Sequence, residues 1–80
     1  MPATRVKLIW DFHGPDAEKI AGHHAVHLGE FAEREQLEIP ITGIENLSEM
    51  HSIAFLVVNQ EKMIAVRDAL KPHRGQVYNG

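Results

Sequence analysis

Cysteine is absent from the 80-residue chain, which excludes disulfides, thiolate metal sites and thiol nucleophiles. Because disulfide staples are typical of very small secreted domains, their absence favours a reducing compartment, and we expect a cytoplasmic protein. No apolar run approaches the roughly 20 residues that a membrane helix needs. The opening residues, MPATRVKLIW, have no long apolar segment and no small-residue cleavage site, so no signal peptide is expected.

A strong excess of one charge is also missing, since the net charge is −3 with histidine neutral and the 8 Lys and Arg residues are scattered. Only KPHRG, residues 71–75, is locally basic. This stretch suits one anion but forms no stripe for nucleic acid, so we expect no nucleic-acid partner. No glycine-rich phosphate loop is present. Ser48 and Ser52 lie near His51, but outside the strand–turn–helix context of a nucleophile elbow.

Histidine is the residue that the chain has in excess, with 6 in 80 positions. Three of them fall in HHAVHLGEF, residues 23–31. A chain of this length fits one small domain, residues 1–80, with a thin hydrophobic core. Such domains often gain stability by forming oligomers.

The hydrophobic pattern predicts a domain of strands and helices. RVKLIWDFH, residues 5–13, alternates between two faces as a strand does. Residues 53–58 are apolar without a break, which indicates a strand buried on both faces. Pro40 cannot donate to a ladder, so its strand should lie at a sheet edge or carry a bulge. In chain order, we expect a strand at 5–13, a helix at 16–36, strands at 37–47 and 51–59, a helix at 60–71 and a strand at 75–78.

The histidines of the first predicted helix divide between its faces. At about 100° per residue, His24 falls inside the apolar arc, His27 at its edge and His23 toward solvent. A histidine in such an arc is either a hydrogen-bonded core residue or a residue that meets a ligand. The arc itself consists of Ala17, Ile20, Ala21, Leu28, Phe31 and Ala32.

The order βαββαβ predicts an α+β fold of the ferredoxin-like type. Right-handed crossovers then give an antiparallel four-stranded sheet with strand order 4-1-3-2 and both helices on one face. The third strand is apolar on its other face as well, and monomers rarely expose a large apolar patch. We therefore expect a homodimer in which a second copy covers that face.

The chain resembles the dimeric α+β barrel superfamily in layout and length. The stretch MHSIAFLVVNQEKMIAVRDALKPH, residues 50–73, is similar to the strand–helix half of small uncharacterised members. The resemblance implies two ferredoxin-like sheets packed face to face, with a pocket between helices and sheet. The superfamily includes cofactor-free monooxygenases, isomerases and haem-handling proteins, and fold resemblance does not select among these functions.

The predicted topology brings histidines from distant parts of the chain to one edge of the sheet. His13 ends the first strand, His51 begins the antiparallel third strand, and His73 precedes the fourth. Asp11 shares a face with His13, and it could orient an imidazole, bind a metal, or act as a general base if burial raised its pKa. We expect His24 and His27 to face the same sheet from the helix.

Three imidazoles, or two and a carboxylate, suit zinc, and the second set also suits iron(II). HHAVH lacks the glutamate of the H-E-x-x-H metal motif, so the spacing names no metal. The candidate catalytic residues are His13, His24 and Asp11. The candidate ligands of a divalent metal such as zinc or iron are His13, His24, His27, His51 and His73. The same histidines also fit core, cap or surface roles.

Three functions stay open at this point. The first is a homodimeric binding protein that takes a metal or a small ligand in a histidine-containing pocket between helices and sheet. The second is a small oxygenase- or isomerase-type enzyme that uses His or Asp as base or metal ligand. The third is a structural component of a larger assembly. Arg74, beside His73, could hold the carboxylate of a small molecule in the first two.

Overall fold

The structure, a computed structural model, describes residues 4–35 and 41–78. Its elements follow the predicted order βαββαβ. None of the helices in the described ranges is long and apolar enough to cross a membrane. The elements are β1 (Arg5–His13), α1 (Ala17–Arg34), β2 (Ile41–Ser48), β3 (His51–Asn59), α2 (Gln60–Leu70) and β4 (Arg74–Tyr78).

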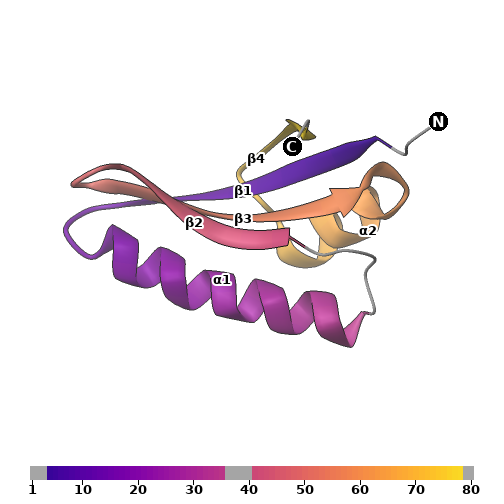
Figure 1. The fold of residues 1–80 in the computed structure, drawn as a ribbon, viewed down its shortest axis with the longest axis horizontal. Coiled ribbons are helices and arrows are strands. Elements are labelled where there is room, and N and C mark those ends of the chain that lie inside the picture. Colours follow the sequence, from indigo (N-terminus) through magenta and orange to yellow (C-terminus); the bar gives the residue numbers. More distant parts are fainter. Residues whose placement is uncertain (1–3, 36–40, 79–80) are drawn as a thin grey trace.

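The four strands form one antiparallel sheet in the order β2-β3-β1-β4, which reads 4-1-3-2 from the β4 edge. Figure 1 shows both helices on the same side of the sheet. β1 and β3 are central and pair in register from Arg5↔Asn59 to His13↔His51. β2 lies at an edge, as predicted from Pro40, although that proline itself lies outside the described residues.

The hydrophobic core lies between the helices and one face of β1 and β3. Leu8 and Trp10 of β1 and Leu56 of β3 are buried there against both helices. The indole Nε1 of Trp10 donates to the carbonyl oxygen of Leu70 at 3.1 Å, which ties the end of α2 to the sheet. Burial of apolar area stabilises this layer, and the hydrogen bond holds the C-terminal end of α2 against the sheet.

The buried stripe of α1 is narrower than the predicted arc. Ala17, Ala21 and Ala32 are buried, whereas Ile20 is 48% exposed, so its inward assignment was wrong. The small alanine side chains bring the helix close to the sheet, and only residues near the centre of the stripe are covered. Residue 36, where the predicted helix ended, lies outside the described residues.

The open face of the sheet, defined as the face away from the helices, is not the bare apolar surface that the sequence predicts. Its apolar residues Ile9, Ile53 and Val57 are only 2%, 3% and 1% exposed. Ile9 lies in register between Phe55 on one side and Arg74 on the other. Larger neighbouring side chains therefore cover the apolar residues within the single chain.

Phe55 is the centre of that cover. Gly43 of β2 lies opposite Phe55, and a Cβ at position 43 would be 2.9 Å from the ring, so the ring packs directly on the glycine. The ammonium of Lys7 sits 4.4 Å from the ring centroid and pairs with Glu45 at 3.2 Å. The ammonium of Lys7 is attracted to the face of the aromatic ring. The carbon chain of the lysine meanwhile covers apolar area beneath it.

Candidate functional site

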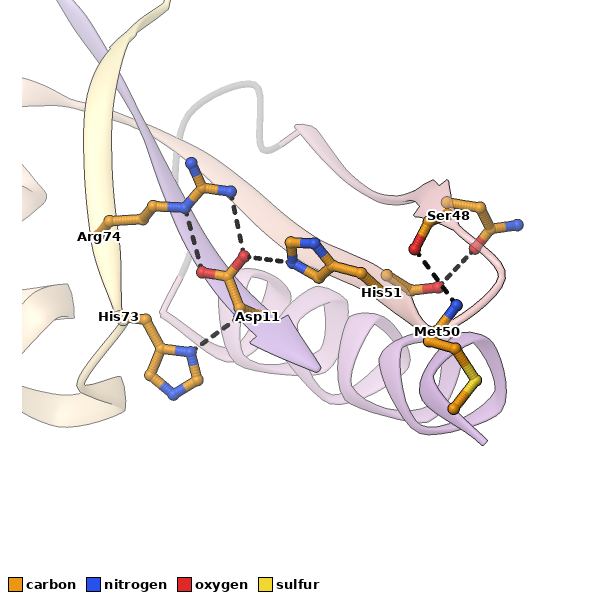
Figure 2. Close-up of polar contacts among 8 residues, drawn as sticks. Asp11, Ser48, Met50, His51, His73 and Arg74 are labelled. Atoms are coloured by element: carbon orange, nitrogen blue, oxygen red, sulfur yellow. Dashed lines mark hydrogen bonds and ion pairs between the residues drawn. The ribbon is translucent and has the colours of Figure 1, made fainter. Parts of the chain in front are cut away.

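Asp11, whose side chain lies on the open face, is the centre of a group of polar residues, the Asp11 cluster (Figure 2). His51 and Arg74 contact its carboxylate, and His73 contacts its backbone N–H. These residues are distant in sequence, and strand pairing brings them together. Ile53 lies opposite Asp11, which places His51 beside it on the same face. Arg74 lies opposite Ile9 on β4, so it reaches Asp11 diagonally.

The Asp11 carboxylate accepts hydrogen bonds from both sides. Arg74 Nε donates to Oδ2 and Nη2 donates to Oδ1, each at 3.1 Å, in a bidentate pair. His51 Nε2 lies 2.8 Å from Oδ1. The Asp11 side chain is 18% exposed, so water screens these contacts less than it would on an open surface.

Burial raises the pKa of Asp11, but the hydrogen bonds and charges of Arg74 and His51 lower it more, and the net pKa lies below the usual value. A general base needs a pKa near the working pH. The raised pKa that would make Asp11 a base is therefore not found. The carboxylate stays ionised and holds the His51 imidazole by its Nε2–H, as carboxylates orient histidines in catalytic and metal sites.

His73 contacts β1 with a defined tautomer. The backbone N–H of Asp11 donates to Nδ1 of His73 at 2.8 Å, and the backbone N–H of His73 donates to the carbonyl of Ile9 at 2.9 Å. Nδ1 can accept only when it carries a lone pair. In this contact the imidazole is neutral and carries its proton on Nε2, which is left as a donor on the side away from β1.

His13 completes this end of the sheet. Its ring stacks on that of His51, with centroids 4.2 Å apart and an interplanar angle of 17°. Gly14, at φ 110°, donates its N–H to the carbonyl of Met50 at 2.8 Å, which holds the end of β1 beside the β2–β3 turn. The predicted convergence of strand-end histidines near Asp11 is thus what the structure has.

His24 does not join them. Its ring packs between Trp10 and Phe12 on the helix side of the sheet, with centroids 5.1 and 5.4 Å away. Nε2 is buried and has no hydrogen-bond partner in the described part of the chain. Burial lowers the pKa of His24, and the nearby His27, His73 and His23 lower it further, so the ring is a neutral part of the core.

His27 is on the outer side of α1, where it is 61% exposed. Across residues 4–35 and 41–78, no three side chains of His, Asp or Glu are arranged to hold a metal ion. The predicted zinc or iron site with at least three ligands is therefore not assembled from these residues. The physical reason is that α1 directs His24 into the core and His27 outward, away from the strand ends.

A groove of about 440 Å³ runs between α2 and β4. Apolar side chains from β1, α2 and β4 line most of it, and Arg67 and His73 supply polar groups. The sequence predicted a histidine-containing pocket between helices and sheet but did not place it at α2 and β4, and it did not predict the partner of Arg74. The signal for Arg74 was available, because antiparallel pairing of the last strand with the first sets it diagonal to Asp11. The full lining is Val6, Leu8, Met63, Arg67, Pro72, His73, Arg74, Gly75, Gln76 and Val77.

Comparison of the chain with protein-family models, with curated proteins and with solved structures found no match.

The lowered pKa of Asp11 predicts a pH-dependent contribution to stability. A carboxylate with a depressed pKa stabilises the folded state above its unfolded pKa of about 3.9, and this contribution is lost as the pH falls through the folded pKa. Asp11→Asn should lower the free energy of unfolding by about 1–3 kcal/mol at pH 7, measured by urea denaturation. The difference between the two proteins should shrink between pH 5 and pH 3.

Asp68→Asn is the matched control, because its carboxylate is exposed and lies 3.6 Å from Arg67. It should change stability by less than about 0.5 kcal/mol at either pH. A gap between wild type and Asp11→Asn that stays constant down to pH 3 would contradict the ionised role of Asp11.

Proposed function

We propose that this chain binds a small molecule with an apolar body and an anionic end in the groove between α2 and β4. The observation that carries the proposal is the combination, in one groove, of an apolar floor, an arginine and an imidazole N–H donor. Its volume of about 440 Å³ lies in the range of small-ligand sites, which are mostly apolar with a few placed polar groups.

The floor of the groove supports an apolar body. Val6 and Leu8 of β1 form its base, and Met63 of α2 and Val77 of β4 stand on either side. Gly75 keeps the groove open, because a Cβ there would come within 3.4 Å of the Leu8 side chain and fill part of the space. A flat or flexible hydrocarbon group fits such a surface through burial of apolar area.

The polar groups of the groove favour an anionic end. Arg74 is held by Asp11 through two hydrogen bonds, whereas the one ionic contact of Arg67 within residues 4–35 and 41–78 is with Asp68 at 3.6 Å. Arg67 therefore retains donors for a carboxylate or a sulfonate. The Nε2–H of His73, on the ring that Asp11 holds through Nδ1, supplies a neutral donor at the same groove.

A pair of fluorescent probes tests this proposal. The aromatic sulfonate 8-anilinonaphthalene-1-sulfonate has an apolar body and an anionic end, and N-phenyl-1-naphthylamine has the same body without the charge. We expect one sulfonate probe per chain. Arg67→Gln should weaken its binding about tenfold, the loss of one charge-assisted hydrogen bond, and should leave the uncharged probe unaffected.

Two further variants complete the design. Gly75→Leu fills the groove and should weaken binding of both probes, whereas Lys62→Gln changes a cation of α2 outside the groove and should weaken neither. Circular dichroism confirms that each variant is folded. The groove is not the binding site if Arg67→Gln weakens the binding of both probes equally, or if Gly75→Leu binds both probes as tightly as the wild type does.

A second candidate function, proton transfer, is favoured by the contact between Asp11 and His51. With its Nε2–H donated to Asp11, His51 keeps a lone pair on Nδ1, for which the described residues provide no hydrogen-bond partner. This is the arrangement of a general base that a carboxylate orients. His51 would be the base, and Asp11 the positioning residue.

Nitrogen-15 NMR of the His51 ring tests the second candidate. At neutral pH the neutral ring should carry its proton on Nε2 in the wild type, and Asp11→Asn should give a mixture of the two tautomers. Trp10→Phe, which removes an indole hydrogen bond elsewhere, should leave the His51 tautomer as it is. A wild-type ring protonated on Nδ1 would exclude His51 as this base.

We also propose a homodimer, as the resemblance to the dimeric α+β barrel proteins implies. Its support is the size of the domain, because a chain of 80 residues has a thin core and gains from a covered sheet face. The partner would pack on the outer side chains of the open face, which include Phe55 and the ion pair of Lys7 with Glu45. The apolar residues beneath them are already buried within the single chain.

Sedimentation equilibrium at micromolar concentration measures this directly. The wild type should be dimeric, and Phe55→Glu, on the open face, should shift it to monomer. Ile64→Glu should leave the protein dimeric, because Ile64 is an exposed residue of α2, on the opposite side of the molecule from the open face. A monomeric wild type would contradict the dimer proposal. It would not affect the proposal of a ligand site in the groove between α2 and β4.

A further inference from the structure

His23 and His27 form a close pair on the solvent side of α1. Their Nε2 atoms are 3.0 Å apart, with ring centroids at 4.6 Å and an interplanar angle of 75°. The four-residue spacing sets them one turn apart on one face, where α-helical side chains meet. The pair lies outside both the Asp11 cluster and the ligand groove, and neither proposed function uses it.

Glu30 contacts one member of this pair. Its Oε1 lies 3.0 Å from Nδ1 of His27. When the neutral His27 donates its Nδ1–H to that carboxylate, its Nε2 carries a lone pair and accepts the Nε2–H of His23. A carboxylate on the far nitrogen of an imidazole is the outer contact that metal-ligating histidines usually have.

The distance between the two nitrogens fits a metal ion. Two imidazole nitrogens at about 2.0–2.1 Å from a metal lie about 3 Å apart when they occupy neighbouring positions near 90°. Such an angle belongs to square-planar or octahedral coordination, and a tetrahedral ion would need the nitrogens further apart. The structure has them at 3.0 Å.

We infer that His23 and His27 bind a divalent transition-metal ion of the copper(II) type, with Glu30 as the positioning residue. Copper(II) accepts neighbouring imidazoles in a square plane and stands highest in the general affinity order for such ligands. His23 changes to the tautomer with its proton on Nδ1, so that both Nε2 lone pairs face the ion and no proton is lost. Because no third His, Asp or Glu of the described residues completes the set, water fills the remaining positions.

Titration of copper(II) into untagged, chelator-treated protein in a non-coordinating buffer tests this site. We expect one ion per chain by calorimetry, and nitrogen ligation in the electron paramagnetic resonance spectrum. His23→Asn and His27→Asn should each raise the dissociation constant at least about tenfold. Glu30→Gln should raise it by about tenfold, the usual effect of removing an outer contact.

His13→Asn and His73→Asn are the matched controls, because both histidines are also exposed but lie away from the pair. They should leave copper binding unchanged. The ion should also raise the melting temperature of the wild type but not of His23→Asn, since a ligand stabilises only the state that binds it. Equal copper affinity of the wild type and His23→Asn would overturn the inference, as would a loss in the control variants that matches the loss in His23→Asn.

Discussion

The antiparallel pairing of β1 with β3 is the constraint on which the rest of the structure depends. It runs without a break from Arg5↔Asn59 to His13↔His51. Because side chains alternate along a strand, this register sends Leu8 to the helices and Asp11 to the open face. A slip of one residue would move a carboxylate into the core, so the apolar pattern of both strands fixes the register.

His73 connects the two candidate sites. Its Nδ1 accepts the backbone N–H of Asp11, while the residue also lines the groove beside Arg67. A ligand that bonds to the free N–H of His73 would thus contact the same ring that marks the junction of β1 and β4. Arg74 adds a bidentate pair across the same two strands, so the short β4 is held by side chains as well as by its ladder.

Much of the fold could be predicted because its determinants are local. The alternation of residues 5–13 and the apolar run at 53–58 set the bounds of β1 and β3, and the element order with right-handed crossovers set the topology. The same topology brought His13, His51 and Asp11 to one end of the sheet. The prediction of a bare apolar sheet face was wrong, because Phe55 and its neighbours cover that face within the chain.

The sequence by itself determined which residues share a strand face, which histidines stand one helical turn apart and which strand ends meet. These follow from the periods of the strand and the helix. Tertiary structure alone decided which nitrogen of His73 carries a proton, why the pKa of Asp11 falls rather than rises, and how closely His23 approaches His27. Such features depend on distances of a few ångströms between side chains from separate elements or in particular rotamers, and residue spacing carries no information at that scale.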